Sequence, residues 1–392
     1  MTETLDPVLG RYGFDRHLSE PARAVLAEMV AQAESRIRPV MNDAWERAVM
    51  PDEVLGTLVP LNLMEPAGVS AEEADSSMFA GFRSFHLARI DASVATMYNA
   101  QAGLFRAVAR HGSSPEQAAQ WDPKVRRFDM KGVFALTEPE HGSDIAGGLA
   151  TRARREGDEW VIDGAKRWIG GADTADVIAV FARDEADDQV KCFLVDRHAE
   201  GVDIEVIGGK VSLRPMQNAH ITLTGVRVPE AMRAQGVNSW RDVAALLRRM
   251  RSDVAWMAAG VAAGALDAAV RYTRERTQFG RPIASFQLIQ EKLARMLGNA
   301  VSCVALTVAL SAHQDAGVWN DENSALAKMV TAERARENAA LAREVMGGNG
   351  ILLEHDAARF FADAEAIYSY EGTHEVNALI VGRSLTGASA FV

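Results

Sequence analysis

The chain has 392 residues, of which 48% are hydrophobic and 24% are charged, so a globular protein with a sizeable core is expected. Its net charge of −11 argues against general binding to nucleic acid or to anionic membranes. The two cysteines, Cys192 and Cys303, lack metal-type spacing and fit a reducing compartment. The acidic start of the chain, residues 1–6, lacks the apolar core of a signal peptide. We therefore predict a cytoplasmic protein without a metal site.

The first part of the chain has a helical pattern. Ser19-Glu20-Pro21 predicts a helix start with proline at an early position, and apolar residues then recur with a helical period. A loop is expected over 64–76, where a proline, a glycine and several acidic residues gather. The other predicted helices of this part are 51–62, 77–92, 93–111 and a short one from Pro115.

Short strands follow from Lys131 onward. Asp163-Gly164 lies between the runs 159–162 and 165–169, and this dipeptide predicts a tight hairpin. The other expected strands are 132–136, 177–182, 191–195, 203–206 and 221–228. Short strands at regular spacing indicate a small antiparallel sheet, arranged as a barrel or a sandwich.

Helices return near Trp240 and continue to the end of the chain. The apolar tract 254–270 contains Asp267 and is short for a bilayer, so we expect a buried helix and no membrane insertion. The resulting α+β architecture has a helical domain at 1–130, a β domain at 131–236 and a second helical domain at 237–392. The predicted helices of the last domain are 242–275, 287–314, 320–345, 355–364 and 374–386.

A polar turn follows the first predicted strand, over residues 136–144. The hydroxyls of Thr137 and Ser143 and the N–H groups around Gly142 could hold the polar edge of a planar ligand or a phosphate. A Pro/Gly turn capped by Ser143 or Asp144 is the alternative. The turn has no G-x-G-x-x-G pattern and opens no βαβ unit, which argues against a Rossmann nucleotide fold.

Arginines gather at two places in the last domain. Arg248, Arg249 and Arg251 precede the apolar helix, and their forked donors suit a phosphate, although a solvated basic patch is the alternative. The segment 274–282 combines three arginines with Phe279 at a helix break. Three arginines and an aromatic residue in so short a segment suggest that it contacts a ligand and is not only a loop between two helices.

One carboxylate near the end of the chain is a candidate base. Glu371 follows an aromatic and apolar run and precedes Gly372 and Thr373. Desolvation raises the pKa of a carboxylate and makes it a stronger base, and the glycine allows a tight turn beside a ligand. An ordinary helix end is the alternative.

These motifs occur in the order found in the acyl-CoA dehydrogenase family, which the chain resembles over nearly its whole length. The run from Tyr370 to Phe391, at the end of the chain, is most similar to the glutaryl-CoA dehydrogenase branch. The resemblance implies an N-terminal helical domain, a middle antiparallel β-barrel and a C-terminal four-helix bundle. The matching sequences are Leu-Thr-Glu-Pro-x-x-Gly-Ser-Asp (136–144), Gly-x-Lys-x-Trp-Ile (164–169), Arg-x-Gln-Phe-Gly-x-Pro-Ile (276–283), Gly-Gly-Asn-Gly (347–350) and Tyr-Glu-Gly-Thr (370–373).

The resemblance also implies FAD, bound between the middle domain and the bundle, with two subunits building each cofactor site. The residues expected around the flavin are Phe134, Leu136, Thr137, Gly142, Ser143, Trp168 and Ile169. Those expected to contact the FAD tail, largely across the subunit interface, are Arg276, Gln278, Phe279, Gln287, Met346, Gly347 and Gly348. Thr373, Glu375 and Phe391 complete the expected cofactor contacts.

By the same resemblance, Glu371 removes the α-proton of an acyl-CoA, and the β-hydrogen leaves as hydride to flavin N5. The products are a 2,3-enoyl-CoA and reduced FAD, which an electron-transfer flavoprotein reoxidises. A homo-oligomer, a dimer of dimers, is expected. The residues expected near the substrate are Ser143, Arg251, Gly372, Ala95 and Tyr98.

Two positions depart from the family pattern. Gly170 stands where many relatives have a hydroxyl residue, which removes a hydrogen bond near flavin N5 and puts redox tuning in doubt. Ala95 stands where the glutaryl branch has an arginine for the distal carboxylate of its substrate. Burying that carboxylate unpaired would cost several kcal/mol, so we expect glutaryl-CoA to be excluded.

Other functions fit the same fold. The enzyme could act on a carrier-protein thioester, since the arginines at 248–251 do not separate CoA from a carrier's phosphopantetheine. A flavin monooxygenase needs no base, so Glu371 argues against it. A flavin-binding or flavin-free subunit with little dehydrogenase activity is the third alternative, and Gly170 gives it slight support.

Overall fold

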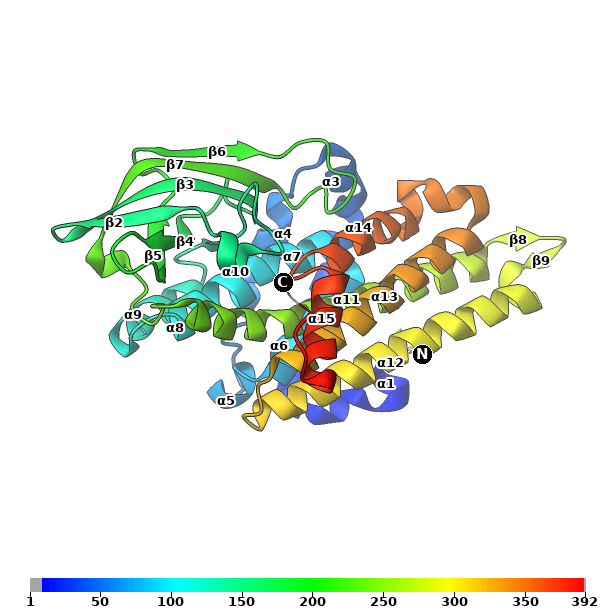
Figure 1. Cartoon of the computed structure of the whole chain (residues 1–392). Helices are drawn as coiled ribbons and strands as arrows, with labels where there is room; N and C mark the ends of the chain where they lie inside the picture. The colour runs from blue at the N-terminus through cyan, green and yellow to red at the C-terminus, as the bar shows by residue number, and fades with distance from the viewer. Residues whose placement is uncertain (1–8, 391–392) are drawn as a thin grey trace. The chain divides into compact units, whose positions relative to one another are not determined.

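The computed structural model describes residues 9–390 and contains two compact units. The helical unit comprises residues 9–96, 211–215 and 251–390, and the sheet unit comprises 97–210 and 216–250. Two helices, α7 (Ala92–Asn99) and α11 (Trp240–Glu275), continue from one unit into the other. Figure 1 labels the elements of both units. The three-part order of helices, strands and helices is confirmed, while the boundaries predicted near 130 and 236 remain predictions.

The sheet unit holds seven strands, ordered β1-β4-β2-β3-β7-β6 with β5 paired to β4. Their bounds are β1 (Gly132–Ala135), β2 (Arg152–Glu156), β3 (Glu159–Gly170), β4 (Val177–Asp184), β5 (Val190–Asp196), β6 (Val202–Val206) and β7 (Asn218–Pro229). The barrel-like sheet is mixed in direction, because β4 pairs in parallel with both β1 and β2. The helical segments of this unit are η5 (Ala100–Phe105), α8 (Arg106–His111), α9 (Pro115–Arg126), α10 (Ile145–Gly148) and η6 (Glu230–Met232).

Strand β4 is apolar along most of its length because both of its faces are covered. Ala179 and Phe181 point into one hydrophobic cluster, with Trp121. Ile178 and Val180 point into a second cluster on the other face of the strand. Alternate side chains of a strand point to opposite faces, so a strand buried on both sides has a continuous apolar sequence.

The hairpin predicted at Asp163-Gly164 is wrong. Residues 159–170 form one strand, β3, with a register shift between Ile162 and Gly164 against β7. A Cβ at Gly164 would lie 2.7 Å from the Thr151 Cα, so the glycine permits close backbone approach and not a turn. The hairpin turn is at Gly157-Asp158, between β3 and β2, a strand that the sequence pattern did not predict.

The helical unit contains the remaining elements. Its N-terminal segments are α1 (Leu9–Tyr12), η1 (Phe14–His17), α2 (Glu20–Gln32), η2 (Ala33–Ile37), η3 (Arg38–Val40), α3 (Met41–Arg47), α4 (Asp52–Leu58), η4 (Val59–Leu61), α5 (Ala71–Ala74) and α6 (Ser77–Ile90). Its C-terminal segments are β8 (Thr277–Gln278), β9 (Arg281–Pro282), η7 (Ile283–Ser285), α12 (Gln287–Asp315), α13 (Asp321–Val345), η8 (Gly347–Ile351), η9 (Leu353–His355), α14 (Ala357–Ser369) and α15 (His374–Thr386).

The helix starts predicted at Ser19 and Asn320 are confirmed, and both carry a side-chain cap. The Ser19 hydroxyl accepts from the Ala22 N–H at 3.2 Å, and the Asn320 side chain accepts from the Asn323 N–H at 3.0 Å. Two predictions were wrong in detail. The loop expected over 64–76 includes the short helix α5, and the helix expected over 355–364 extends as α14 to Ser369.

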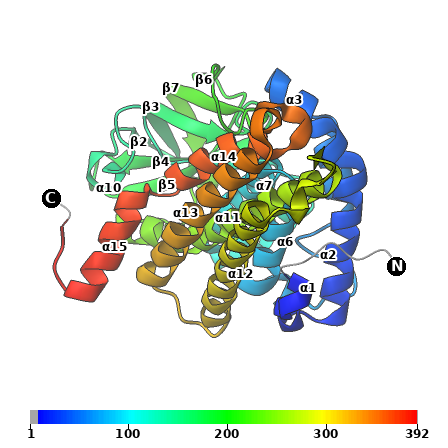
Figure 2. The ribbon, with the colours of Figure 1, turned by 90° about the vertical axis from the view of Figure 1, so that its right-hand side faces the viewer.

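Helix α13 is central to the C-terminal part of the helical unit. Figure 2 shows α11, α12 and α13 side by side. The buried Asn338 on α13 joins them, since its Nδ2 donates to the Ala262 carbonyl at 3.0 Å and to the Met296 carbonyl at 2.9 Å. A buried amide with satisfied hydrogen bonds fixes the relative register of the helices that it joins.

Two helices are long and apolar enough, by length and composition, to cross a membrane. In α11, 83% of the apolar window is buried inside the structure, as in the core helix of a globular domain. In α12 the buried share is 44%, so this helix leaves an apolar face uncovered. Such helices alone are weak evidence of a membrane span.

Candidate active site

Glu371 lies in a short link between α14 and α15, with a backbone in the left-handed region. Its φ is 53°, and the φ of Gly372 is 88°. Residues other than glycine rarely adopt this backbone conformation, and where they do, the surrounding structure has to hold it in place. Backbone strain of this kind gathers at functional sites. Gly372 also has a positive φ, and glycine adopts this conformation without the steric cost that a Cβ atom would bring.

Glu371 is half-buried and interacts electrostatically with two cations. Burial raises the pKa of its carboxyl, while Arg251 and Lys328 oppose that rise. Asp253 lies in the same region of α11, and burial raises its pKa to about 7, with Arg83 opposing and Glu371 adding to the rise. The helical unit thus brings the predicted Glu371, Gly372 and Arg251 together. A carboxyl with a raised pKa beside cations suits proton abstraction.

Tyr370, the neighbour of Glu371, packs toward α7. Its hydroxyl lies 3.4 Å from the Thr96 Oγ1, and burial raises its pKa, so the phenol stays neutral. Ala95, next to Thr96, is buried. Tyr98 is also buried and belongs to the sheet unit, where its ring centroid lies 5.6 Å from that of Phe128.

In the sheet unit, a buried ion pair holds the turn at 136–144. The Lys166 Nζ donates to the Glu138 Oε1 at 2.8 Å and to the Leu136 carbonyl at 3.2 Å. Glu138 also accepts from the Ala150 N–H at 2.6 Å and from the Thr151 N–H at 2.9 Å. Burial lowers the pKa of Lys166 to about 8, although Glu138 raises it. The pair joins this turn to β3, which carries Trp168.

Some of the predicted flavin-lining groups are free to meet a ligand, and others are not. The hydroxyls of Thr137 and Ser143 have no hydrogen-bond partner within residues 9–390. Trp168 is 51% exposed at a φ of 66°, with the Arg167 guanidinium 5.1 Å from its ring centroid. Leu136 and Ile169 have buried side chains in the two hydrophobic clusters, so only their backbones could contact a ligand.

Two further residues that were predicted to line the flavin belong to the sheet unit. Phe134 is half-buried, and its ring centroid is 4.6 Å from that of Phe181. Gly142 is exposed, and its carbonyl accepts from the Ile145 N–H at 3.3 Å. Exposed Gly142, Ser143 and Trp168 together offer polar groups and an aromatic surface, which a planar polar ligand such as a flavin requires.

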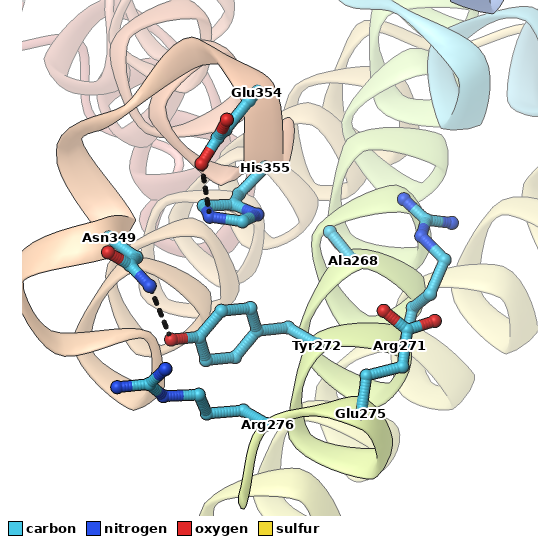
Figure 3. A pocket seen from close by; sticks show the side chains of 8 residues that line it. All are labelled: Ala268, Arg271, Tyr272, Glu275, Arg276, Asn349, Glu354 and His355. Carbon is cyan, nitrogen blue, oxygen red and sulfur yellow. Dashed lines mark hydrogen bonds and ion pairs between the residues drawn. The ribbon is translucent and has the colours of Figure 1, made fainter.

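A cavity of about 410 Å³ opens in the helical unit between α11 and the segment after α13 (Figure 3). The Asn349 Nδ2 donates to the Tyr272 Oη at 2.9 Å, and the Glu354 Oε1 lies 3.0 Å from the His355 Nε2. The lining residues are Ala268, Arg271, Tyr272, Glu275, Arg276, Asn349, Glu354 and His355.

The two arginines of this cavity differ in their partners. Arg271 is fixed by Asp356, 2.9 Å away, and Asp356 also accepts from Arg38 at 2.8 Å and from Arg359 at 2.7 Å. The Arg276 guanidinium has no ion pair or hydrogen bond in the described part of the chain. A free arginine in a cavity is suited to an anion such as a phosphate.

The other residues predicted for the FAD tail do not line this cavity, and most of them are exposed. Phe279 is 93% exposed at a φ of 52° in the β8–β9 hairpin, beside the exposed Gln278. Gln287 begins α12 and is exposed, as are Gly347 and Gly348. Met346 is buried, and its carbonyl lies 3.4 Å from the Tyr272 Oη, which donates to it.

The last predicted contacts follow the candidate base. Thr373 caps α15, since its hydroxyl accepts from the Val376 N–H at 3.2 Å, and Glu375 is exposed in the first turn of α15. Phe391 lies outside the described residues. Within residues 9–390, no group of three or more His, Cys, Asp or Glu side chains could hold a metal ion.

Sequence reasoning missed several residues that the structure places in these sites. Lys328 and Asp253 near Glu371 were not predicted, nor were Tyr272 and Asn349 in the cavity. For Lys328 a signal exists, because a lysine stands there on the small-residue face of α13, among Ala325, Ala327 and Thr331. A lysine on a buried helix face is uncommon unless it is paired.

Comparisons with known proteins show which family the chain is similar to. The model of the acyl-CoA dehydrogenase C-terminal domain matches residues 239–386, and that of the middle domain matches residues 133–226. A mouse protein named short-chain specific acyl-CoA dehydrogenase, mitochondrial, is 31% identical over 76% of this chain and 73% of its own length. A Clostridium sporogenes protein named 3-(aryl)acrylate reductase is 30% identical over 90% of this chain and 95% of its own length.

The solved structures that resemble the chain include two of glutaryl-CoA dehydrogenase from Mycobacterium smegmatis. One is 32% identical with a TM-score of 0.89, and the other, in complex with FADH2, is 30% identical with a TM-score of 0.91. Both similarities cover 98% of this chain and 99% of the other chain.

Proposed function

The chain belongs to the acyl-CoA dehydrogenase family, and we propose that Glu371 is the base that removes the α-proton of its acyl-CoA substrate. Family membership makes it a flavin-dependent oxidoreductase acting on CH–CH bonds. The observation that carries the proposal is the strained, half-buried Glu371, with a raised pKa, beside Arg251 and Lys328. A base in this setting is strong enough to take a weakly acidic proton, while the nearby cations keep part of it ionised.

The residues of this chain fit FAD. Thr137, Ser143 and Trp168 offer free hydroxyls and an exposed indole for the flavin end, and Arg276 offers a free guanidinium for a phosphate of the tail. When bound, FAD supplies the two-electron acceptor for the β-hydrogen. The Glu138–Lys166 pair holds the turn that carries Thr137 and Ser143.

The acyl group of the substrate is uncharged. Ala95 is a buried methyl group at the position where the resemblance expects an arginine for a distal carboxylate. Next to it, Thr96 approaches the neutral hydroxyl of Tyr370, which adds no positive charge to the neighbourhood of the base. A carboxylate buried there would be unpaired and costly.

The exposed apolar groups support a homo-oligomer. Phe279 is 93% exposed, Leu288 76% and Ile351 70%, and α12 leaves more than half of its apolar window uncovered. Large apolar side chains so exposed are typical of protein interfaces. In the oligomer, these residues would lie against a second copy, whose bound FAD would extend its tail toward Arg276. An electron-transfer flavoprotein is the expected electron acceptor by the family resemblance.

Anaerobic mixing with a panel of thioesters tests this proposal. We expect bleaching of the flavin absorbance by a neutral acyl-CoA, among short straight, branched, medium and arylpropionyl chains, and none by glutaryl-CoA. Ala95→Arg should gain reduction by glutaryl-CoA and lose rate with the neutral substrate. If no acyl-CoA bleaches the flavin of the holoenzyme, the function is wrong; if glutaryl-CoA is the fastest, the substrate class is wrong.

A further inference from the structure

A fully buried lysine contacts the backbone on both sides of Glu371. Lys328 lies on α13 and has no exposed surface. Its Nζ donates to the Tyr368 carbonyl at 2.7 Å and to the Gly372 carbonyl at 2.8 Å. The two acceptors bracket the candidate base, one near the end of α14 and one directly after Glu371.

The carbonyls that Lys328 holds belong to a link that would not keep its shape alone. Glu371 and Gly372 both have positive φ, a conformation that an unrestrained glutamate rarely adopts. A second clamp acts on the same link, since the Nδ2 of the buried Asn377 donates to the Gly372 carbonyl at 2.8 Å and to the Thr373 carbonyl at 3.0 Å. Asn377 belongs to α15, the helix that directly follows the link. Lys328 belongs to α13 and therefore connects the link to a separate helix.

The charge of Lys328 is also placed where it acts on the base. Of the ionisable groups around it, Arg251 is a like charge, while Glu371 and Glu375 are opposite charges. Burial lowers the pKa of Lys328 to about 8, and the two glutamates oppose that fall. Asp253 adds a further carboxyl near Glu371. An apolar side chain would fill the same space without desolvating a charge, so packing alone does not account for a lysine here.

We infer that Lys328 is a positioning residue for the base: its ammonium holds Glu371 in the left-handed conformation through the Tyr368 and Gly372 carbonyls, and it places a positive charge beside the carboxylate. The inference rests on the proposed role of Glu371. No atom is transferred to or from Lys328; the α-proton of the substrate moves to the Glu371 carboxylate, and the ammonium keeps its three protons.

Two substitutions separate charge from packing. Lys328→Met removes the charge and both hydrogen bonds with little change in length, and Lys328→Arg keeps the charge. The readout is the rate of flavin reduction by a neutral acyl-CoA as a function of pH, measured on the holoenzyme. The acid limb of this pH profile is the part in which the rate falls as the Glu371 carboxylate is protonated. We expect Lys328→Met to move the acid limb upward by about one pH unit, because a nearby opposite charge favours the ionised carboxylate. Lys328→Arg should leave the acid limb at its wild-type pH, because the positive charge is kept.

A second readout does not depend on turnover. Hydrogen–deuterium exchange of the backbone amides over 369–373 should become at least about tenfold faster in Lys328→Met, since local opening controls exchange. Lys292→Met is the matched control, because Lys292 lies on α12 in an ion pair with Glu344, and both readouts should match wild type. If Lys328→Met does not fold, Lys328→Gln replaces it with the same expected shift of the acid limb.

The inference is overturned if the folded Lys328→Met or Lys328→Gln protein keeps both the wild-type acid limb and the wild-type exchange over 369–373, or if Lys328→Arg shifts the limb as far as Lys328→Met. A wild-type enzyme that no acyl-CoA reduces would refute the proposed function instead. In that case the exchange experiment still decides whether Lys328 holds the link.

Discussion

At the scale of single residues, the site depends on side chains whose surroundings change their ordinary chemistry. Glu371, Trp168 and Phe279 share a positive φ, which is unfavourable for non-glycine residues. All three were predicted from sequence as functional residues. The surrounding structure has to hold such a backbone in place, so the three positive φ values support the predicted roles: Phe279 lies in the β8–β9 turn, Glu371 in the link between α14 and α15, and Trp168 within β3.

The first prediction concerns the pH dependence of the base. Burial raises the pKa of Glu371 above its ordinary value of 4.5, and only the ionised form can take a proton. The rate of flavin reduction should therefore rise with pH through an inflection above 4.5 and fall as the carboxyl is protonated below it. Rapid-mixing kinetics across pH measure this limb. An inflection at or below the ordinary glutamate value would contradict the assigned environment.

The second prediction concerns Gly170, where the family resemblance leads us to expect a hydroxyl residue. A Cβ at Gly170 would lie 2.5 Å from the Met216 Cε, so the methionine occupies the space that a serine side chain would need. Gly170→Ser should lower the free energy of unfolding by about 1 kcal/mol or less, because the flexible end of the Met216 side chain can move aside. The double variant with Met216→Ala should lose less than the sum of the two single variants. Urea unfolding measures all four proteins, and strict additivity would show that the two positions do not compete for space.

At the scale of elements, the turn at 136–144 is held to β3 by charge. The side chains of Lys166 and Glu138 are 0% and 3% exposed, so neither can turn to water. A buried charge left without its partner is strongly destabilising. The pair also joins elements that carry residues predicted to contact the flavin, since the turn carries Thr137 and Ser143 and β3 carries Trp168.

The third prediction follows from this pair. Lys166→Met should destabilise the protein by about 3–5 kcal/mol and lower its flavin content, because Glu138 is left buried and unpaired. The double variant Lys166→Met with Glu138→Gln should recover much of the loss. Unfolding free energies and the flavin-to-protein absorbance ratio measure both effects. Equal losses in the single and double variants would mean that the ion pair is not the cause.

Element positions could be predicted well from sequence where the signal was local. The start signal at Ser19-Glu20-Pro21 and the apolar periods located most of the helices to within a few residues. The error at Asp163-Gly164 arose because a glycine that permits close approach to Thr151 has the same local sequence as a hairpin turn. Glu371 was predictable from its motif. Its clamp by Lys328, which is 43 residues away in sequence, was not, because that contact exists only after α13 and α14 pack.

At the scale of the whole molecule, the exposed apolar groups of the helical unit support the proposed homo-oligomer. The β8–β9 hairpin displays Phe279 almost entirely to solvent, near the free guanidinium of Arg276. This arrangement supports the proposal that a second copy covers the hairpin and completes the cofactor site. It also explains why α12 is apolar without being fully buried.

The fourth prediction tests this interface. Phe279→Ser should weaken self-association and lower flavin content together, since the same hairpin serves both. Light scattering coupled to size exclusion, and the flavin absorbance of each fraction, measure the two effects. Val211→Ser is the control, because Val211 is 77% exposed outside the hairpin and should change neither. An oligomer of unchanged size and flavin content in Phe279→Ser would show that the hairpin lies outside the interface.

The measurement that tests the central claim most directly is anaerobic reduction of the flavin by a neutral acyl-CoA in wild type and in Glu371→Gln. Glutamine keeps the size of the side chain but cannot accept the α-proton, so flavin content and thioester binding should persist while reduction slows by about 10²–10⁴-fold. Wild-type reduction rates in a folded, flavin-loaded Glu371→Gln protein would contradict the assignment of Glu371 as the base.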